Sequence, residues 1–270
     1  MRIAACATVV MAGVAVATFA GGRVHAEQTR QPTGAELSTA AATGVAQRWE
    51  RMPAGRVFPA TIGYTTDLQT KEAATRLGID PRTACSRALD GTLLRQAERD
   101  GCVAALRADY ADQLAGSVYT LGIFAFPDKA KASAFYAKVP LVSYPATGLH
   151  ALAVPGTAAA GFGDAARQAA TAQLAGPYVV LAVAGYADGR PANAADERRD
   201  SVFDPASQLV TAIAAPLAKP VAVRCGTTEW ACAVTSYPDI PPPPPTLAQI
   251  RPDEMKTLNQ IRAPGSCPCG

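Results

Sequence analysis

The chain has few of the residues that build common catalytic and metal sites. It contains two histidines, of which only His150 lies outside the apolar N-terminal segment. One histidine excludes metal sites with two imidazole ligands and leaves one imidazole as a candidate base. The sequence also has no Gly-x-Ser-x-Gly elbow, no Walker lysine and no Gly-x-Gly-x-x-Gly fingerprint. Motifs therefore predict no catalytic residue, no cofactor and no metal ligand.

The net charge is also small. The formal net charge is +3, and it falls to +1 without residues 1–26, which contain Arg2 and Arg23 but no acidic residue. A nearly neutral domain without a basic run lacks the surface that nucleic acid or anionic lipid would need. We expect neither as a partner, and the membrane only through an N-terminal anchor.

Residues 1–26 predict an export signal. Arg2 precedes the uncharged apolar run 3–20, and Val24-His25-Ala26 offers small residues at the two positions that signal peptidase reads. A run of this length is also at the lower limit for a membrane-spanning helix, so an uncleaved anchor is the alternative. Both interpretations predict an extracytoplasmic protein, secreted or attached to the membrane by this segment.

The cysteines agree with export. Cys6 lies in the signal, and the even number that remains predicts disulfides in an oxidising compartment: Cys85, Cys102, Cys225, Cys232, Cys267 and Cys269. Proximity favours Cys85–Cys102, worth roughly 3 kcal/mol in the chain-entropy model. Cys225–Cys232 is the next most favoured pair. Cys267 and Cys269 then bond to each other, or they bond to Cys225 and Cys232 instead. A Cys₄ zinc site is the alternative, although its spacings do not match a zinc knuckle.

Composition divides the rest of the chain into three parts. Residues 27–35 predict a tether, residues 36–219 an α+β domain, and residues 220–270 a Pro/Cys-rich tail. The five prolines at 241–245 favour polyproline II, as a stiff spacer or as a ligand for a proline-binding groove.

Hydrophobic periodicity predicts the elements of the domain. We expect helices at 36–52, 71–77, after Pro81, and at 93–100, 128–139 and 205–218, and strands at 102–110, 118–126, 149–154, 169–174 and 178–186, with an extended stretch at 57–64. Strand 102–110 alternates between apolar and polar residues, which predicts an outer strand with a wet face. Strands 118–126 and 178–186 are apolar on both faces and are expected at the centre.

A repeated tetrapeptide suggests how these elements combine. Gln-Leu-Ala-Gly occurs at 113–116 and again at 173–176, and we interpret both copies as hairpin turns. The fold prediction is α+β: an antiparallel sheet of four to five strands from two ββα units, with helices mainly on one face and a Cys85–Cys102 staple.

Two groups of polar residues deserve a chemical hypothesis. His150 could form a Ser/His/Asp arrangement with Ser143 and Asp164, against the simpler interpretation as a loop histidine with ordinary hydrogen bonds. Asp109 and Asp112 flank the first hairpin, and we interpret them as solvated edge charges and not as a catalytic acid pair. Gly161-Phe162-Gly163-Asp164 is interpreted as a loop.

Several segments together resemble a family of proteins. They are RVFPATIGY at 56–64, Cys85 with Cys102, GPYVVL at 176–181 and AGYADGR at 184–190. Over about 49–219 the chain resembles uncharacterised exported or single-anchored proteins of high-GC Gram-positive (actinobacterial) bacteria. The resemblance implies an envelope location, often with one N-terminal anchor. It implies no activity and no catalytic residue.

The leading functional hypothesis is a non-catalytic extracytoplasmic domain of the cell envelope that binds a partner protein or a small apolar ligand. One alternative is an exported hydrolase that uses His150. The other is a structural or assembly factor of the envelope, with the polyproline segment reaching a neighbour.

Overall fold

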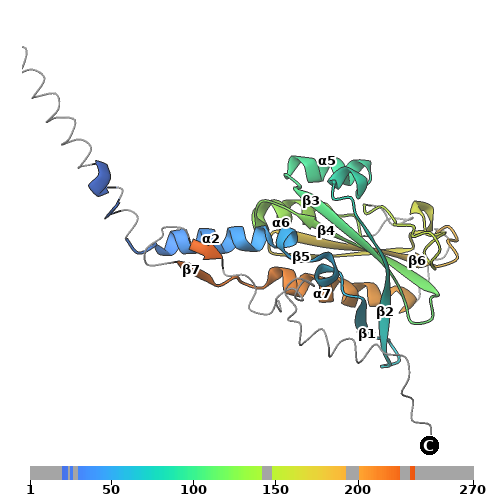
Figure 1. Ribbon diagram of the computed structural model, residues 1–270. Coiled ribbons are helices and arrows are strands. Elements are labelled where there is room, and N and C mark those ends of the chain that lie inside the picture. The colour runs from blue at the N-terminus through green and yellow to red at the C-terminus, as the bar shows by residue number, and fades with distance from the viewer. Residues whose placement is uncertain are drawn as a thin grey trace, which may run out of the picture. The chain divides into compact units, whose positions relative to one another are not determined.

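The domain is built on one six-stranded antiparallel sheet (Figure 1). The structure is a computed structural model that describes residues 20–23, 25–26, 30–141, 148–192, 201–225 and 232–234, with only the backbone at 201, 224–225 and 232–234. In spatial order the strands are β1 (Thr61–Thr65), β2 (Lys71–Asp80), β3 (Ala104–Ala111), β4 (Ser117–Ala125), β6 (Tyr178–Tyr186) and β5 (Ala169–Ala175). The α+β class and the antiparallel sheet are confirmed, with more strands than predicted.

Helices and a small second sheet surround these strands. The helices are α2 (Gly34–Ala46), α3 (Arg48–Arg51), α4 (Ala54–Val57), α5 (Gly91–Arg99), α6 (Lys129–Tyr136) and α7 (Pro205–Ala218), with 3₁₀ turns η1 (Cys85–Arg87), η2 (Asp164–Ala166) and η3 (Ser201–Phe203). The second sheet pairs β7 (Val223–Cys225) with β8 (Cys232–Val234) beside α2 (Figure 1).

The central strands are β4 and β6, as predicted, and both are buried along nearly their whole length. Leu121 and Ile123 of β4 join the core under α7, whereas Val118 and Phe124 join the core under α5 and α6. A sheet that is apolar on both faces must be covered on both. The prediction of helices mainly on one face is therefore wrong: α6 and α7 pack on opposite faces.

Strand β2 replaces a predicted helix. Residues 71–77 favour a helix by intrinsic propensity, because Lys, Glu, Ala, Arg and Leu are good helix formers. In the structure, Lys71–Asp80 pairs with β1 on one side and β3 on the other, with a register shift between Arg76 and Gly78. Its first half pairs with β1 and its second half with β3, so sheet pairing supplies hydrogen bonds along the segment and overrides the local preference. The helix expected after Pro81 is reduced to η1.

Because β2 occupies the edge of β3, the prediction that 102–110 is an outer, wet strand is also wrong. β3 lies between β2 and β4. Its polar residues are buried, with Arg107 at 4% and Asp109 at 0% exposure. Alternation showed two different faces but did not show that something other than water covers the polar one.

Residues 149–154 form no strand. Leu149 makes one isolated bridge to Leu89, and the segment crosses the sheet as an irregular loop. The first predicted turn, 113–116, lies in the loop between β3 and β4, where Ala115 has positive φ. In the second copy, Gln173, Leu174 and Ala175 belong to β5, and only Gly176 lies in the turn. The two copies of the tetrapeptide thus adopt different secondary structures.

The Cys85–Cys102 disulfide is confirmed, with a sulfur–sulfur distance of 2.07 Å. It joins η1 to the segment that enters β3. Cys225 and Cys232 are register partners in β7–β8, whereas Cys267, Cys269 and the polyproline run lie outside the described residues. Most of the predicted export signal also lies outside them. No described helix is long and apolar enough to cross a membrane.

Buried polar side chains attach the N-terminal helices to the body of the domain. Arg48 of α3 donates to the carbonyl of Pro216 at 2.9 Å and to those of Leu217 and Lys219, which end α7. A cation at a helix C-terminus both satisfies the last carbonyls and complements the helix dipole. On β6, the Tyr178 hydroxyl lies 2.6 Å from the Val45 carbonyl at the end of α2.

Replacing Arg48 should therefore loosen α2, α3 and the end of α7. We expect Arg48→Met to lower the free energy of unfolding by about 3 kcal/mol, because it leaves several buried carbonyls without a donor. Urea denaturation gives the loss, and hydrogen exchange locates it. Arg51→Met on the same helix is the control, expected within about 0.5 kcal/mol of wild type. Equal losses in both variants would contradict this role for Arg48.

The register of β7–β8 favours the Cys225–Cys232 bridge. Directly opposite residues in an antiparallel pair have Cα atoms about 4.5–5.5 Å apart, within the range that disulfides span. Peptide mapping under non-reducing conditions should recover Cys225 linked to Cys232. A link from either residue to Cys267 or Cys269 would contradict it.

Candidate functional site

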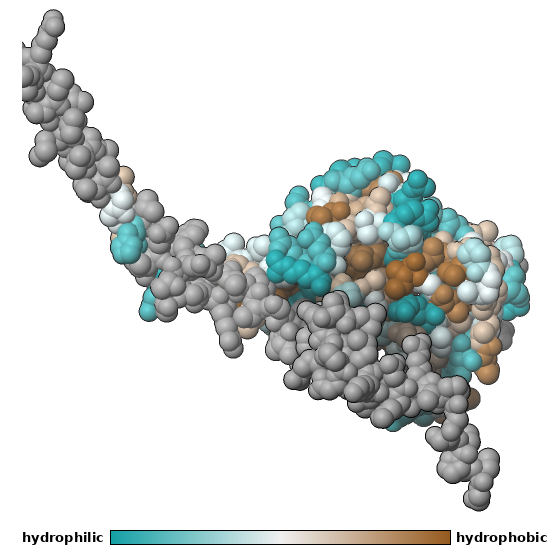
Figure 2. Space-filling model, viewed as in Figure 1, coloured by the Kyte–Doolittle hydropathy of each residue, from teal (hydrophilic) through white to brown (hydrophobic). Residues whose placement is uncertain are grey.

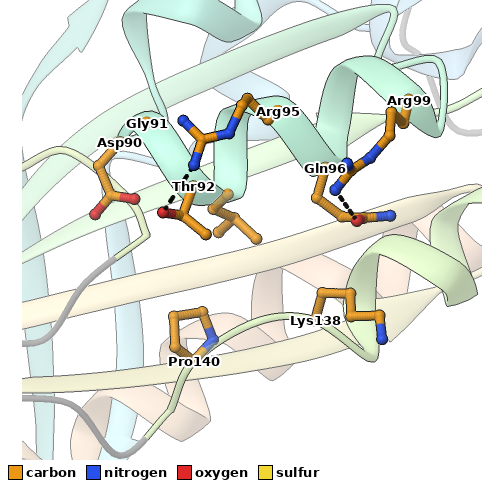
Figure 3. Close-up of a pocket in the computed structure, with 9 residues that line it drawn as sticks. Asp90, Gly91, Thr92, Arg95, Gln96, Arg99, Lys138 and Pro140 are labelled. Carbon is orange, nitrogen blue, oxygen red and sulfur yellow. Dashed lines mark hydrogen bonds between the residues drawn. The ribbon is translucent and has the colours of Figure 1, made fainter.

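A groove of about 750 Å³ lies between α5 and the chain that follows α6. Figure 3 shows α5 along one wall and Lys138 with Pro140 along the other. Hydrophilic residues dominate the surface over α5 (Figure 2). The lining residues come mainly from α5: Asp90, Gly91, Thr92, Leu93, Arg95, Gln96, Arg99, Lys138 and Pro140.

Helix α5 is amphipathic, and this places its cations in the groove. Leu93 and Ala97 are buried in the core, whereas Arg95 and Arg99 lie one turn apart on the exposed side. On the other wall, α6 is held in the core by Phe135 and others, and Lys138 follows its end.

The three cations of the groove have no acidic partner within the part of the chain that the structure describes. Arg95 donates to the Thr92 hydroxyl at 3.4 Å, and Arg99 donates to the Gln96 side-chain carbonyl at 2.7 Å (Figure 3). The acidic lining residue, Asp90, is hydrogen-bonded within the chain: its carboxylate accepts a bond from the Gly148 amide at 2.6 Å. The groove is therefore electropositive.

Beside the groove, residues 148–154 cross the sheet as a loop that we call the strap. Leu149 is buried over β4, where a Cβ at Gly122 would lie 2.8 Å from the Leu149 side chain. The strap's backbone is held by side chains: the Arg167 guanidinium donates to the Leu149 carbonyl at 2.6 Å, and the Leu152 amide donates to the Thr120 hydroxyl at 2.9 Å. It is a loop whose polar backbone is satisfied by buried residues.

His150 and Asp164 meet at the surface of the strap, as the triad hypothesis required. His150 Nδ1 lies 2.6 Å from Asp164 Oδ2, and the Ala151 amide donates to the other carboxylate oxygen at 2.8 Å. Burial opposes ionisation of Asp164, but these two bonds and nearby Arg167 lower its pKa overall. Ser143 lies outside the described residues, and among those described the His150 side chain contacts no hydroxyl that could act as nucleophile.

An ion pair lies beneath the strap. Arg107 of β3 donates to Asp80 at 2.6 Å and to the His150 carbonyl at 3.2 Å. Burial alone would raise the pKa of Asp80, but hydrogen bonds from Arg82 and Arg107 lower it to about 2. The pair therefore stays ionised at physiological pH and fixes the strap to β2 and β3.

Asp109, also beneath the strap, corrects the interpretation of edge charges. One carboxylate oxygen accepts a hydrogen bond from the Thr120 hydroxyl at 2.7 Å, while the other has no hydrogen-bond partner in the described part of the chain. Burial raises the pKa of Asp109 to about 7, although the Thr120 bond opposes the shift. Asp112 is half-buried and accepts a bond from the Gly116 amide at 2.8 Å. The two aspartates thus have separate structural roles.

A second hollow, of about 210 Å³, carries the opposite charge. Its lining includes four acidic residues: Asp67, Glu72, Asp112 and Asp204. At its floor the Tyr64 hydroxyl donates to Glu72 at 2.6 Å. No group of histidines, cysteines and carboxylates among the described residues has a geometry that could hold a metal ion.

Comparisons with protein-family models, curated proteins and solved structures find no match. The assignment of a site therefore depends on geometry. Sequence reasoning found His150 and Asp164 but missed the groove. The available signal was Arg95 and Arg99 four residues apart, on the side of a predicted helix opposite Leu93 and Ala97.

The buried Asp109 predicts a pH-dependent stability. Its pKa is higher in the folded state than the ordinary value of 3.8, so the folded state retains the proton that the unfolded chain releases. Stability should fall as pH rises from about 4 to about 7, by up to about 4 kcal/mol. Asp109→Asn should lack this contribution, so its difference from wild type should change across that interval in urea denaturation.

The control for this measurement is Asp188→Asn, at a side chain that is 60% exposed. Its stability difference from wild type should stay nearly constant over the same pH range. If the Asp109→Asn difference is equally constant, Asp109 is ionised in the folded protein and the prediction is wrong.

Proposed function

We propose that the protein is an exported, non-catalytic binding domain of the cell envelope whose binding site is the groove between α5 and the chain that follows α6. The observation that carries the proposal is the set of three cations around one open hollow, none of them paired with a carboxylate among the described residues. Charges that serve the fold are normally paired or hydrogen-bonded to the backbone, as Arg107 and Arg167 are here. Arg95, Arg99 and Lys138 contribute no comparable contact to the fold.

The hydrogen bonds of His150 support the non-catalytic part of the proposal. Its imidazole bonds Asp164, its amide donates to the Ala88 carbonyl at 2.8 Å, and its carbonyl accepts from Arg107. These contacts account for the residue as part of the strap. A base that activates a nucleophile needs that nucleophile within hydrogen-bond reach.

Two features support the proposed location. The N-terminal apolar segment and the Cys85–Cys102 bridge are both typical of proteins that leave the cytoplasm. The lining of the groove favours a charged or polar ligand, or a partner protein with such a surface, over a small apolar ligand.

The second candidate is an exported hydrolase. The short contact between His150 Nδ1 and Asp164 favours it, because a carboxylate at this nitrogen orients an imidazole for general-base work. The His150 side chain is 34% exposed and so is accessible to a substrate. What this candidate requires in addition is a nucleophile or an activated water at the other ring nitrogen.

His150→Ala and His150→Asn separate the two functions. In a screen with ester, amide, phosphoester and glycoside substrates, we expect no turnover by wild type that depends on His150. His150→Ala should lose about 1 kcal/mol of stability, since Asp164 loses a partner. His150→Asn should recover part of that loss, because its amide can still donate to the carboxylate. Wild-type turnover that both variants abolish would overturn the proposed function.

A further inference from the structure

The cations of the groove are arranged in a fixed pattern. Arg95 and Arg99 are four residues apart on α5, which places their Cβ atoms about 6 Å apart along the helix. Lys138 extends from the opposite wall (Figure 3). A ligand lying in the groove would therefore meet positive charge from both sides and at two points along its length.

The field of these cations is little compensated. Asp90 is the one acidic residue among the described residues of the lining. One of its oxygens accepts the Gly148 amide and lies 3.8 Å from Arg167, which is buried outside the groove. The carboxylate is thus partly neutralised by another element. In a domain whose formal charge is close to zero, this concentration of positive charge is local.

The remaining lining residues restrict the chemistry of the ligand. Among the residues that the structure describes, no aromatic ring lines the groove, so this part of its wall offers bases and sugars no stacking surface. Leu93 and Pro140 contribute apolar surface, and the other lining side chains are mostly polar or charged. What the groove offers is donors: two guanidinium forks, an ammonium group and the Thr92 hydroxyl. Guanidinium groups bind carboxylate and phosphate oxygens in pairs.

We propose that the groove binds a multivalent oxyanion, with at least two phosphate or carboxylate groups separated by about one helical turn. This inference rests on the proposed function, because it specifies the ligand of the same site. The separation follows from the spacing of Arg95 and Arg99, and the requirement for two charged groups follows from cations on both walls.

The test measures binding of two probes to the full chain by calorimetry at pH 7. Inorganic tripolyphosphate represents a ligand with several phosphate groups, and citrate represents one with several carboxylates. Inorganic phosphate, which has a single anionic group, is the comparison. We expect tripolyphosphate or citrate to bind at least tenfold more tightly than single phosphate. Binding should weaken when salt rises from about 0.05 to 0.3 M, because exposed charges are screened.

Three variants show where the probe binds, and the two double variants remove the same charge. Arg95→Ala/Arg99→Ala, and separately Lys138→Ala, should weaken binding of the better probe tenfold or more. Lys71→Ala/Arg87→Ala removes two exposed cations outside the groove and should change binding by less than twofold. Circular dichroism and thermal unfolding establish that each variant is folded.

Each outcome decides the inference. The tighter of the two probes identifies the oxyanion as phosphate or carboxylate. The proposal of a multivalent oxyanion is overturned if neither probe binds wild type. It is also overturned if the groove variants and the control variant weaken binding equally. Such a failure leaves the non-catalytic function intact, because that function fails only on turnover that depends on His150.

Discussion

The structure depends on one constraint: its central strands are apolar on both faces, so both faces must be covered. On one face α7, with fourteen residues, and the helices before β1 provide the cover. On the other face α6 has only eight residues, which span about 12 Å. The disulfide-linked η1, α5 and the strap cover the rest.

Covering a sheet with a loop has a physical consequence. An irregular segment has no internal ladder of hydrogen bonds, so its buried amides and carbonyls need partners from elsewhere. Arg107, Arg167, Thr120, Asp90 and Asp164 supply them. The buried charges of this face are therefore explained by the backbone of the strap, and the ion pair between Arg107 and Asp80 in turn keeps Arg107 in position.

The same constraint explains which parts of the fold could be predicted. Continuous apolar runs revealed β4 and β6. The N-cap Asp128 located α6, and Pro205 in the first turn located α7, because these signals are local. β2 was missed because its strand state depends on pairing with β1 and β3, which overrides its helical propensity. Arg107 and Asp109 were interpreted as wet for a related reason: alternation separates polar from apolar faces but does not show what covers the polar face.

Candidate functional residues can now be separated from structural ones by how their charges are satisfied. In the sequence, His150 and Asp164 were the candidates for a catalytic site. In the structure they bond to each other, and Asp164 also accepts the Ala151 amide of the strap. Arg95, Arg99 and Lys138 looked like ordinary surface cations, yet they surround one hollow and stabilise little of the fold. Strap residues must be satisfied within the chain, because their partners are buried. The groove cations face solvent, where a ligand can add the interactions that the fold does not make.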